Sequence, residues 1–366
     1  MKIAFLFGSM ARGGAERVIA SLANTYCKWG DDVSIITLDN APSGYPLDER
    51  IEHIHLDVAG KSRNPIEALI RNFKMIHSLR KIMLKNQFDV VVSFALRQAI
   101  FLQYAVPCGR KFKIIASERA NPLQRKLSRI EQMQYDLFLP KLDGFIFQTE
   151  RVSHCYPEKV RKIGTVIHNG IFPEILPAEK IAYQDRRHKD ICAVGRLSYE
   201  KGFDVLLQAF AVFKQTHPEH HLHIYGEGDL RPVIEAQIEQ LNLDKSITLH
   251  GSVPNVMFKV ADMGMFILPS RSEGMPNALM ESMACGLPCI AADCDFGPRE
   301  LLENGQNGLL VPVEDPAALA EAMNQIADNE ELAANMSENA RDIRNTHDGT
   351  IIARKYYDFI MSVIEG

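Results

Sequence analysis

Two glutamates eight positions apart are the first residues whose spacing could serve chemistry. Glu273 and Glu281 lie in the segment SRSEGMPNALMESMACGLPCIAAD, residues 270–293. Pro276 suits the first turn of a helix and Gly286 its end, so Glu273 falls in the preceding loop and Glu281 inside the helix, about two turns further on. A loop that enters a helix offers backbone N–H groups to an anion such as a diphosphate. The alternative is a solvated glutamate at each position.

Two cations form a second group. The segment VGRLSYEKGFD, residues 194–204, directly follows a predicted strand and places Arg196 and Lys201 five positions apart in a glycine-flanked turn. Both side chains can then converge on one diphosphate and neutralise its charge. Standing alone, an exposed Arg and Lys without a ligand is an equally good interpretation, because charges are common in turns.

Glycine pairs follow two further predicted strands. Gly226 and Gly228 flank Glu227 in IYGEGDL, and Gly13 and Gly14 precede a predicted helix in SMARGGAERV. Glycines let a backbone approach a ligand closely, but they also simply make turns. Both pairs therefore support a binding site without defining one.

A scaffold of alternating strands and helices is predicted to hold these segments. The first half has β-rich runs at KIAFLFG, DVSIITL, IEHIHL, FDVVVSFAL, KIIASE and GFIFQT, with helices near residues 15–28 and 65–85. Residues 166–191 contain prolines and little periodicity, which indicates a linker. The pattern then restarts with DICAVGR, the helix DVLLQAFAVFKQTH, and strands at HLHIYGEGD, SITLHGSV, MGMFILP and LPCIAAD. Such alternation predicts two parallel sheets, each with its ligand edge at the carboxyl ends of the strands.

Composition limits the class of protein. A chain of 366 residues is longer than one hydrophobic core usually organises, so two domains are expected. No apolar run approaches the length needed to cross a bilayer, and the first residues read as a buried strand and not as a signal peptide. Seven cysteines without a CxxC pair are typical of free thiols in a reducing cytosol. Residues 1–170 carry 25 Lys and Arg against 16 Asp and Glu, whereas the remainder carries 16 against 30. The basic half suits an anionic membrane or a phosphate-bearing acceptor, and the acidic half argues against nucleic-acid binding.

The glutamate segment resembles family 4 of the glycosyltransferases, which are retaining enzymes with the fold called GT-B. The motif E-x7-E and its embedding S-x-E-G-x-P-x-x-x-x-E-x-M-A-x-G-x-P match nearly throughout, and G-R-L-x-x-x-K-G matches completely. The resemblance implies that Glu273 binds hydroxyls of the donor sugar and Glu281 those of the ribose, since a carboxylate can accept two hydrogen bonds from a diol. It implies that Arg196 and Lys201 neutralise the leaving nucleoside diphosphate.

The resemblance also implies a domain plan. Residues 1–170 would be a Rossmann-like acceptor-binding domain and residues 171–345 a Rossmann-like donor-binding domain, with a C-terminal helix at 346–366 that packs back toward the first domain. Further donor contacts are implied for the glycine turns, for the loop before the glutamate helix and for the turn HGSVPN, where relatives read the nucleobase through backbone groups. The implied donor-binding residues besides Glu281 are Gly13, Gly14, Gly226, Gly228, Val253, Gly274, Met275, Pro276 and Asn277.

The segment ASERANP, residues 116–122, matches the family only in part. Many relatives have a His close to the transferred sugar where this chain has Arg119, so a His-based role cannot be carried over. We interpret Arg119 as a cation that holds an acceptor phosphate or assists the leaving group, and we place Arg12, Glu118 and Asn121 at the acceptor.

Two other patterns are interpreted as structural. Asp293-Cys294-Asp295 spells the DxD metal motif of another glycosyltransferase fold, but it follows the strand after the glutamate helix, where GT-B relatives have a structural loop. His168, His220 and His221 lack ligand spacing. No metal site and no required cofactor are therefore expected.

A basic amphipathic helix is predicted between Pro65 and Lys85. Its apolar residues recur with helical spacing and are expected to face the core: Ile66, Leu69, Ile70, Phe73, Ile76 and Leu79. Its basic residues recur on the opposite side: Arg71, Lys74, Lys81 and Lys85. The interpretations are a solvated face or peripheral contact with an anionic membrane, to which each basic residue would add about 1 kcal/mol.

The expected activity is retaining transfer of a hexose or N-acetylhexosamine from a nucleoside diphosphate sugar, with UDP as the expected nucleotide, to a hydroxyl of a glycan. The resemblance and the charge favour a lipid-diphosphate-linked oligosaccharide or polysaccharide precursor as acceptor, and a cytoplasmic enzyme at the inner face of the plasma membrane. The alternatives are a nucleotide-sugar 2-epimerase of the same fold, an NAD-dependent oxidoreductase, and a nucleotide-sugar-binding partner without activity. The segment GSMARGG after the first strand is not GxGxxG, which weakens the oxidoreductase.

Overall fold

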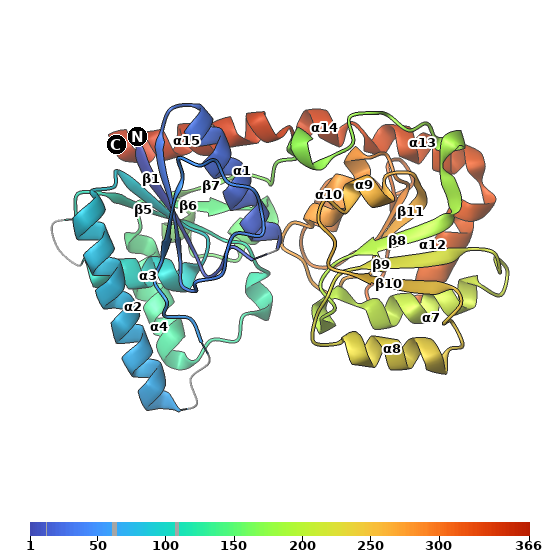
Figure 1. Cartoon of the computed structure of the whole chain (residues 1–366), viewed down its shortest axis with the longest axis horizontal. Coiled ribbons are helices and arrows are strands. Elements are labelled where there is room, and N and C mark those ends of the chain that lie inside the picture. The colour runs from blue at the N-terminus through green and yellow to red at the C-terminus, as the bar shows by residue number, and fades with distance from the viewer. Residues whose placement is uncertain (12, 61–63, 107–109) are drawn as a thin grey trace. The chain divides into compact units, whose positions relative to one another are not determined.

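The computed structural model describes residues 1–11, 13–60, 64–106 and 110–366. The chain divides into two compact units, one formed by residues 1–170 with 350–366 and the other by residues 171–349 (Figure 1). Each unit is built on a parallel sheet flanked by helices, which confirms the predicted α/β class.

The first unit is built on a sheet of seven strands among the residues described. Its strands are β1 (Lys2–Phe7), β2 (Asp32–Thr37), β3 (Glu52–His55), β4 (Val90–Ser93), β5 (Lys113–Ser117), β6 (Gly144–Phe147) and β7 (Gly164–Val166). They lie in the order β3-β2-β1-β4-β5-β6-β7 and all pair in parallel. The order reverses between β1 and β4, which is the switch point where such sheets bind ligands.

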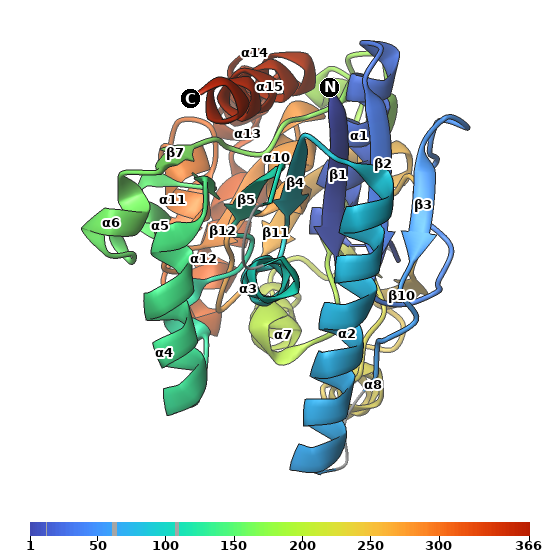
Figure 2. The ribbon, with the colours of Figure 1, turned by 90° about the vertical axis from the view of Figure 1, so that its left-hand side faces the viewer.

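Helices of the first unit cover the two faces of this sheet. They are α1 (Gly14–Lys28), α2 (Pro65–Asn86), α3 (Leu96–Ala105), α4 (Arg129–Phe138), α5 (Glu150–His154), α6 (Glu158–Arg161) and α15 (Gly349–Glu365), with 3-10 turns η1 (Pro122–Gln124) and η2 (Leu139–Lys141). The connection through α1 leads toward the β3 edge of the sheet, whereas those through α2, α3 and α4 lead toward the β7 edge. Because parallel connections are right-handed, α1 lies on one face of the sheet and α2, α3 and α4 lie on the other. α3 packs between α2 and α4 (Figure 2).

The C-terminal helix α15 completes the core of the first unit beside α1. Ile352, Tyr356 and Ile360 are buried with Ile3 and Phe5 of β1 in one hydrophobic cluster. The Tyr26 hydroxyl on α1 also donates to the carbonyl oxygen of Ala353 at 3.2 Å. The last residues of the chain therefore belong structurally to its first half.

Helix α2 departs from the predicted pattern. The residues that it buries are Met75, Leu79 and Met83. Four of the residues expected to face the core are instead exposed, with exposed fractions of 70%, 71%, 52% and 73% for Ile66, Leu69, Ile70 and Phe73. At 3.6 residues per turn, this second apolar face lies roughly 130° around the axis from the buried one. The prediction was wrong because it merged two apolar faces into one.

The second unit is built on a six-stranded parallel sheet. Its strands are β8 (Arg187–Val194), β9 (His221–Tyr225), β10 (Ile247–Gly251), β11 (Met263–Leu268), β12 (Cys289–Ala292) and β13 (Leu309–Val311), in the order β10-β9-β8-β11-β12-β13. The helices are α7 (Phe203–Phe213), α8 (Arg231–Gln240), α9 (Met257–Val260), α10 (Asn277–Ala284), α11 (Pro298–Leu301), α12 (Pro316–Asp328), α13 (Glu330–Ala340) and α14 (Ile343–Thr346), with 3-10 turns η3 (Pro173–Ile175), η4 (Tyr183–Asp185) and η5 (Tyr199–Lys201). The order reverses between β8 and β11, so the loops after these two strands meet at the switch point.

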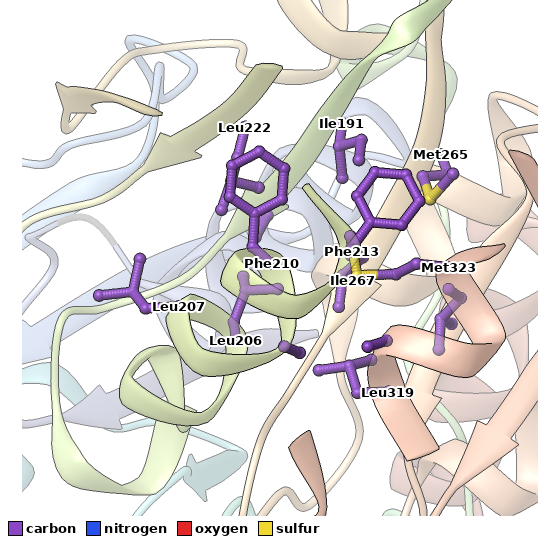
Figure 3. Packing of buried hydrophobic residues seen from close by; sticks show 14 of the residues in the cluster. Ile191, Leu206, Leu207, Phe210, Phe213, Leu222, Met265, Ile267, Leu319 and Met323 are labelled. Atoms are coloured by element: carbon purple, nitrogen blue, oxygen red, sulfur yellow. The ribbon is translucent and has the colours of Figure 1, made fainter. Parts of the chain in front are cut away.

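Two hydrophobic clusters cover the faces of this second sheet. One packs α7 and α12 on the strands through buried residues such as Phe210, Phe213 and Met323 (Figure 3). The other places α9 and α10 on the opposite face, with Leu279 and Met283 of α10 fully enclosed. This packing gives α10 a rigid position immediately after β11.

Candidate active site

A buried carboxylate and a lysine meet at the switch point of the second sheet. Lys201, after β8, donates from Nζ to Glu273 Oε1, after β11, at 2.6 Å. The Ser270 hydroxyl donates to the same oxygen at 2.7 Å. Glu273 is 8% exposed and the Lys201 side chain 28% exposed. The carboxylate is therefore held in one orientation while the lysine still reaches solvent.

Backbone contacts hold the two loops together. Gly202 has a φ of +64°, and a Cβ there would lie 2.1 Å from the carbonyl oxygen of Pro269. Only glycine permits both this left-handed conformation and this approach. The N–H of Arg271 also donates to the carbonyl oxygen of Glu200 at 2.8 Å. The loop that carries Lys201 is thus joined to the loop that carries Glu273 by its main chain.

Arg271 braces the same two loops from the side. Its guanidinium donates to both carboxylate oxygens of Asp204 at 2.8 and 2.7 Å, and to Glu314 at 2.8 Å. It stacks 4.3 Å from the ring centroid of Tyr199. The hydrogen bonds from Arg271 to Asp204 lower the pKa of that carboxyl group. Arg271 was not among the predicted site residues, because nothing in its position in the sequence indicates partners 67 and 43 residues away.

Arg196 lies in the loop after β8, with an exposed side chain. The pKa of Glu200 is lowered, first by a hydrogen bond from its own backbone N–H, then by the Ser198 hydroxyl, and further by the charges of Arg196 and Lys201. The two predicted diphosphate cations therefore act on one carboxylate. The structure places them in the same loop, on the edge that carries Glu273.

The glycine turn after β9 packs directly against this loop. A Cβ on Gly226 would lie 1.8 Å from the carbonyl oxygen of Gly195, and one on Gly228 would lie 2.3 Å from that of Leu197. The N–H of Leu197 donates to the carbonyl oxygen of Glu227 at 3.0 Å. The GxG pattern is therefore required to seat the two loops side by side, whatever ligand they bind.

The turn before α10 is shaped by the loop after β12. Gly297 has a φ of +93°, and a Cβ there would lie 2.5 Å from Pro276 Cδ and 2.9 Å from the carbonyl oxygen of Gly274. The N-cap residue of α10 is Pro276, whose side chain makes no capping hydrogen bond. Met275 is buried and Asn277 begins the helix. The structure places this turn directly before the start of α10, and anion binding there stays a prediction.

Glu281 lies inside α10 and is only 4% exposed. It follows Asn277 by one helical turn, so both residues lie on the same face of the helix. Val253 lies in the turn after β10 and packs partly buried against the cluster that includes α10. A hydrogen bond of 2.8 Å from Gly226 N to Gly251 O joins that turn to the glycine turn after β9. All the predicted donor-binding residues of the second unit therefore follow the carboxyl ends of β9, β10 and β11.

In the first unit, the predicted glycine loop follows β1 at the other switch point. Gly13 has an extended backbone and precedes α1, whose first residue is Gly14. The Tyr45 hydroxyl donates to the Gly13 carbonyl oxygen at 2.8 Å. Arg12 lies outside the described residues.

Arg119 is held by neutral partners in the first unit. Its guanidinium donates to Asn169 Oδ1 and to the Tyr356 hydroxyl, each at 2.7 Å, and stacks 4.2 Å from the ring centroid of Phe94. Burial lowers the pKa of Arg119, and this effect outweighs the nearby Tyr356 and Glu118, which raise it. Arg119 thus connects the loop after β5 to the loop after β7 and to α15. Tyr356 and Asn169 were not predicted, because their approach depends on tertiary packing.

Glu118 and Asn121 organise the same loop. Glu118 Oε1 accepts from the N–H groups of Arg119 and Ala120 at 2.9 and 3.1 Å, while Oε2 contacts Arg125 and the Tyr156 hydroxyl. Asn121 caps η1 by accepting from Leu123 N at 2.9 Å. The predicted acceptor residues therefore have clear structural tasks, and their acceptor role stays a prediction.

The DxD segment lies in the loop after β12. Asp293 pairs with Arg299, and Cys294 is buried beside Glu273, with burial raising the pKa of its thiol to about 12. Among the described residues, no group of three His, Cys, Asp or Glu side chains is arranged to hold a metal ion. None of the helices in the described part of the chain is long and apolar enough to cross a bilayer.

Comparisons with known proteins identify the class to which this fold belongs. Residues 12–174 match the model described as Glycosyltransferase Family 4, and residues 179–343 match Glycosyl transferases group 1. The structure resembles sucrose-phosphate synthase from Thermosynechococcus elongatus with a TM-score of 0.84 at 17% identity, covering 100% of this chain and 99% of that one. It resembles Anabaena HepE in complex with UDP-glucose with a TM-score of 0.80 at 18% identity, covering 99% and 100%. The fold is that of the GT-B glycosyltransferases.

The family follows from the two models, which together match most of the chain: this protein belongs to glycosyltransferase family 4. An uncharacterized glycosyltransferase of Haemophilus influenzae is 27% identical over 344 residues, 92% of this chain and 93% of the relative. A Campylobacter jejuni enzyme is 26% identical over 354 residues, which cover 95% of this chain and 96% of the relative. That enzyme is named as an alpha-1,4-N-acetyl-D-galactosaminyltransferase acting on a diNAcBac-PP-undecaprenol-linked glycan. These matches do not favour the epimerase.

Proposed function

We propose that this glycosyltransferase moves a hexose or N-acetylhexosamine from a UDP-sugar to a hydroxyl of a lipid-diphosphate-linked glycan, with retention at the anomeric carbon. The observation that carries the proposal is the pairing of Lys201 with the buried Glu273 at the switch point of the second sheet. A carboxylate held by Ser270 can accept hydrogen bonds from sugar hydroxyls, and the adjacent lysine can meet a phosphate.

In the proposed reaction, the bond between the anomeric carbon and the diphosphate oxygen breaks while a bond to the acceptor oxygen forms on the same face of the sugar. Lys201, Arg196 and the start of α10 stabilise the charge that develops on the departing diphosphate. Its phosphate oxygen takes the proton of the acceptor hydroxyl. Glu281 binds the ribose hydroxyls, and its burial on α10 keeps that carboxylate in place.

Two comparisons support the choice of substrates. The Campylobacter relative is named for transfer to an undecaprenol-diphosphate-linked glycan, and several structural neighbours were solved with UDP. The excess of basic residues in the first unit suits an acceptor that carries a diphosphate. We therefore place the reaction at the cytoplasmic face of a membrane.

The proposal is tested by incubating the full chain with a panel of UDP- and GDP-sugars and measuring slow hydrolysis without acceptor. We expect hydrolysis of at least one UDP-sugar and thermal stabilisation by UDP. Lys201→Ala should reduce the hydrolysis, whereas Lys245→Ala, which changes an exposed lysine of the same unit, should not. Stabilisation by NAD alone would replace the transferase with an oxidoreductase.

A further inference from the structure

Helix α2 presents a second apolar face that the described residues of its own unit leave uncovered. Ile66, Leu69, Ile70 and Phe73 occupy positions i, i+3, i+4 and i+7, and each is more than half exposed. Leu84 lies on the same side of the helix and is 63% exposed. The exposed His77 and Arg80 separate Leu84 from the first four residues, which form one stripe. An exposed stripe of large apolar side chains marks an interaction site.

Helix α4 repeats this feature on the other side of α3. Ile130, Met133 and Leu137 are spaced as one stripe and are 66%, 62% and 50% exposed. None of the residues of α4 is buried, although the helix begins with a complete capping box at Ser128. Leu123, in the 3-10 turn η1 that precedes α4, is 64% exposed. The start of the helix is therefore well capped, but the described residues of the first unit do not cover its apolar side.

The two stripes lie on the same layer of the first unit. Both α2 and α4 pack against α3, and Figure 2 shows both helices extending past α3 in the same direction. We call Ile66, Leu69, Ile70, Phe73, Ile130, Met133 and Leu137 the α2–α4 apolar surface. It belongs to the first unit alone, on the layer opposite α1 and α15.

Basic residues border this surface. On α2, Lys74, Lys81 and Lys85 are exposed and lie roughly 60–100° around the axis from Ile66. Near α4, Lys126 and Arg129 are exposed. The acidic residues there are fewer: Glu67 on α2 and Glu131 and Asp136 on α4. An apolar stripe bordered by lysine and arginine is the pattern of a helix that lies in the interface of an anionic bilayer.

We propose that the α2–α4 apolar surface inserts into an anionic lipid bilayer, with the bordering lysines and arginines on the lipid headgroups. This differs from contact by charge alone, because the apolar side chains contribute most of the binding. A second copy of the chain is a poorer occupant, since it would bring to the interface a surface with the same excess of basic residues, whereas an anionic bilayer complements that charge.

Vesicle flotation of the full chain without substrate tests the proposal, using phosphatidylcholine vesicles with roughly 30% phosphatidylglycerol. The double variant Leu69→Ser with Phe73→Ser should bind at least about ten-fold more weakly than the unchanged chain. Ile130→Ser with Met133→Ser should also weaken binding. The matched control is Val212→Ser with Phe258→Ser, which removes apolar residues 49% and 51% exposed on the second unit and should bind normally.

The outcomes are separable. Two results would overturn insertion. In the first, the apolar variants bind vesicles as tightly as the unchanged chain. In the second, high salt abolishes all vesicle binding while the apolar substitutions have no effect on it. If the unchanged chain dimerises and does not bind vesicles, and the apolar variants are monomeric, the surface serves self-association instead. Thermal unfolding of each variant checks that the fold is retained. UDP binding, measured on the same samples, reports the proposed function independently, because no residue of this surface belongs to the second unit.

Discussion

Lys201 and Glu273, which are 72 residues apart in the chain, form an ion pair of 2.6 Å between Nζ and Oε1. The pair joins the loops on the two sides of the switch point, so one of its members can contact a sugar while the other contacts a phosphate. In the proposed reaction this pairing would fix the position of Lys201, so little reorganisation would be needed when charge develops on a leaving group.

Lys201→Ala should therefore slow transfer by about ten-fold or more, since one charge that stabilises the leaving diphosphate is lost. Steady-state rates with a UDP-sugar would measure this. The loss should fall mainly on kcat, and a rate equal to that of the unchanged enzyme would remove Lys201 from the mechanism. Lys245→Ala is the control.

Glu281→Gln should weaken UDP binding by about ten-fold, because an amide oxygen replaces one of the carboxylate acceptors proposed for the ribose. Titration calorimetry with UDP gives the affinity, and thermal unfolding without ligand shows whether the buried position tolerates the change. The exposed Glu239→Gln is the matched control. Unchanged affinity for UDP would refute the ribose role.

Gly226→Ala should destabilise the second unit by about 2 kcal/mol or more, because its Cβ would meet the carbonyl oxygen of Gly195 at 1.8 Å and the backbone would have to move. Gly8→Ala is the control, since no atom lies within 4 Å of a Cβ at that position. Urea unfolding of both variants would measure the difference. A stable Gly226→Ala protein would contradict the close packing of the two loops.

Arg119→Ala should lower the melting temperature more than it lowers UDP affinity. Removing the guanidinium takes one hydrogen-bond donor from Asn169 Oδ1 and one from the Tyr356 hydroxyl, at a cost of about 1–3 kcal/mol. Tyr356→Phe should reproduce part of the loss, and the exposed Arg151→Ala should not. If Arg119→Ala keeps its melting temperature but loses transfer, the residue acts on the substrate instead of the fold.

The Arg271–Asp204 pair should make stability depend on pH. The pKa of Asp204 is lowered in the folded protein, so the pair stabilises the fold above the ordinary aspartate pKa of about 4, and this contribution disappears as the pH falls through the lowered value. Arg271→Leu should lower the melting temperature by roughly 2–4 °C at pH 7. The difference from the unchanged protein should narrow in acid. A difference that stays constant down to pH 3 would mean that the ion pair contributes little.

Much of the fold could be predicted from the sequence because parallel strands buried on both faces read as apolar runs, and their helices follow with a clear period. The strand β13 was not predicted, since LLV is too short to stand out. Helix α2 was located correctly, but its buried face was not. Helical spacing shows that apolar residues share a side, and only the position of α3 and the sheet decides which side is covered.

The candidate site divides in the same way. The types and spacing of Glu273, Glu281, Arg196 and Lys201 are local properties, so the sequence by itself determined the family, the α/β class and the loops that carry these residues. Only the tertiary structure decided that Lys201 pairs with Glu273, that Arg271 braces their loops and that Arg119 is enclosed by Asn169 and Tyr356. Such contacts depend on the order of the strands and on packing between distant segments, which local sequence patterns do not specify.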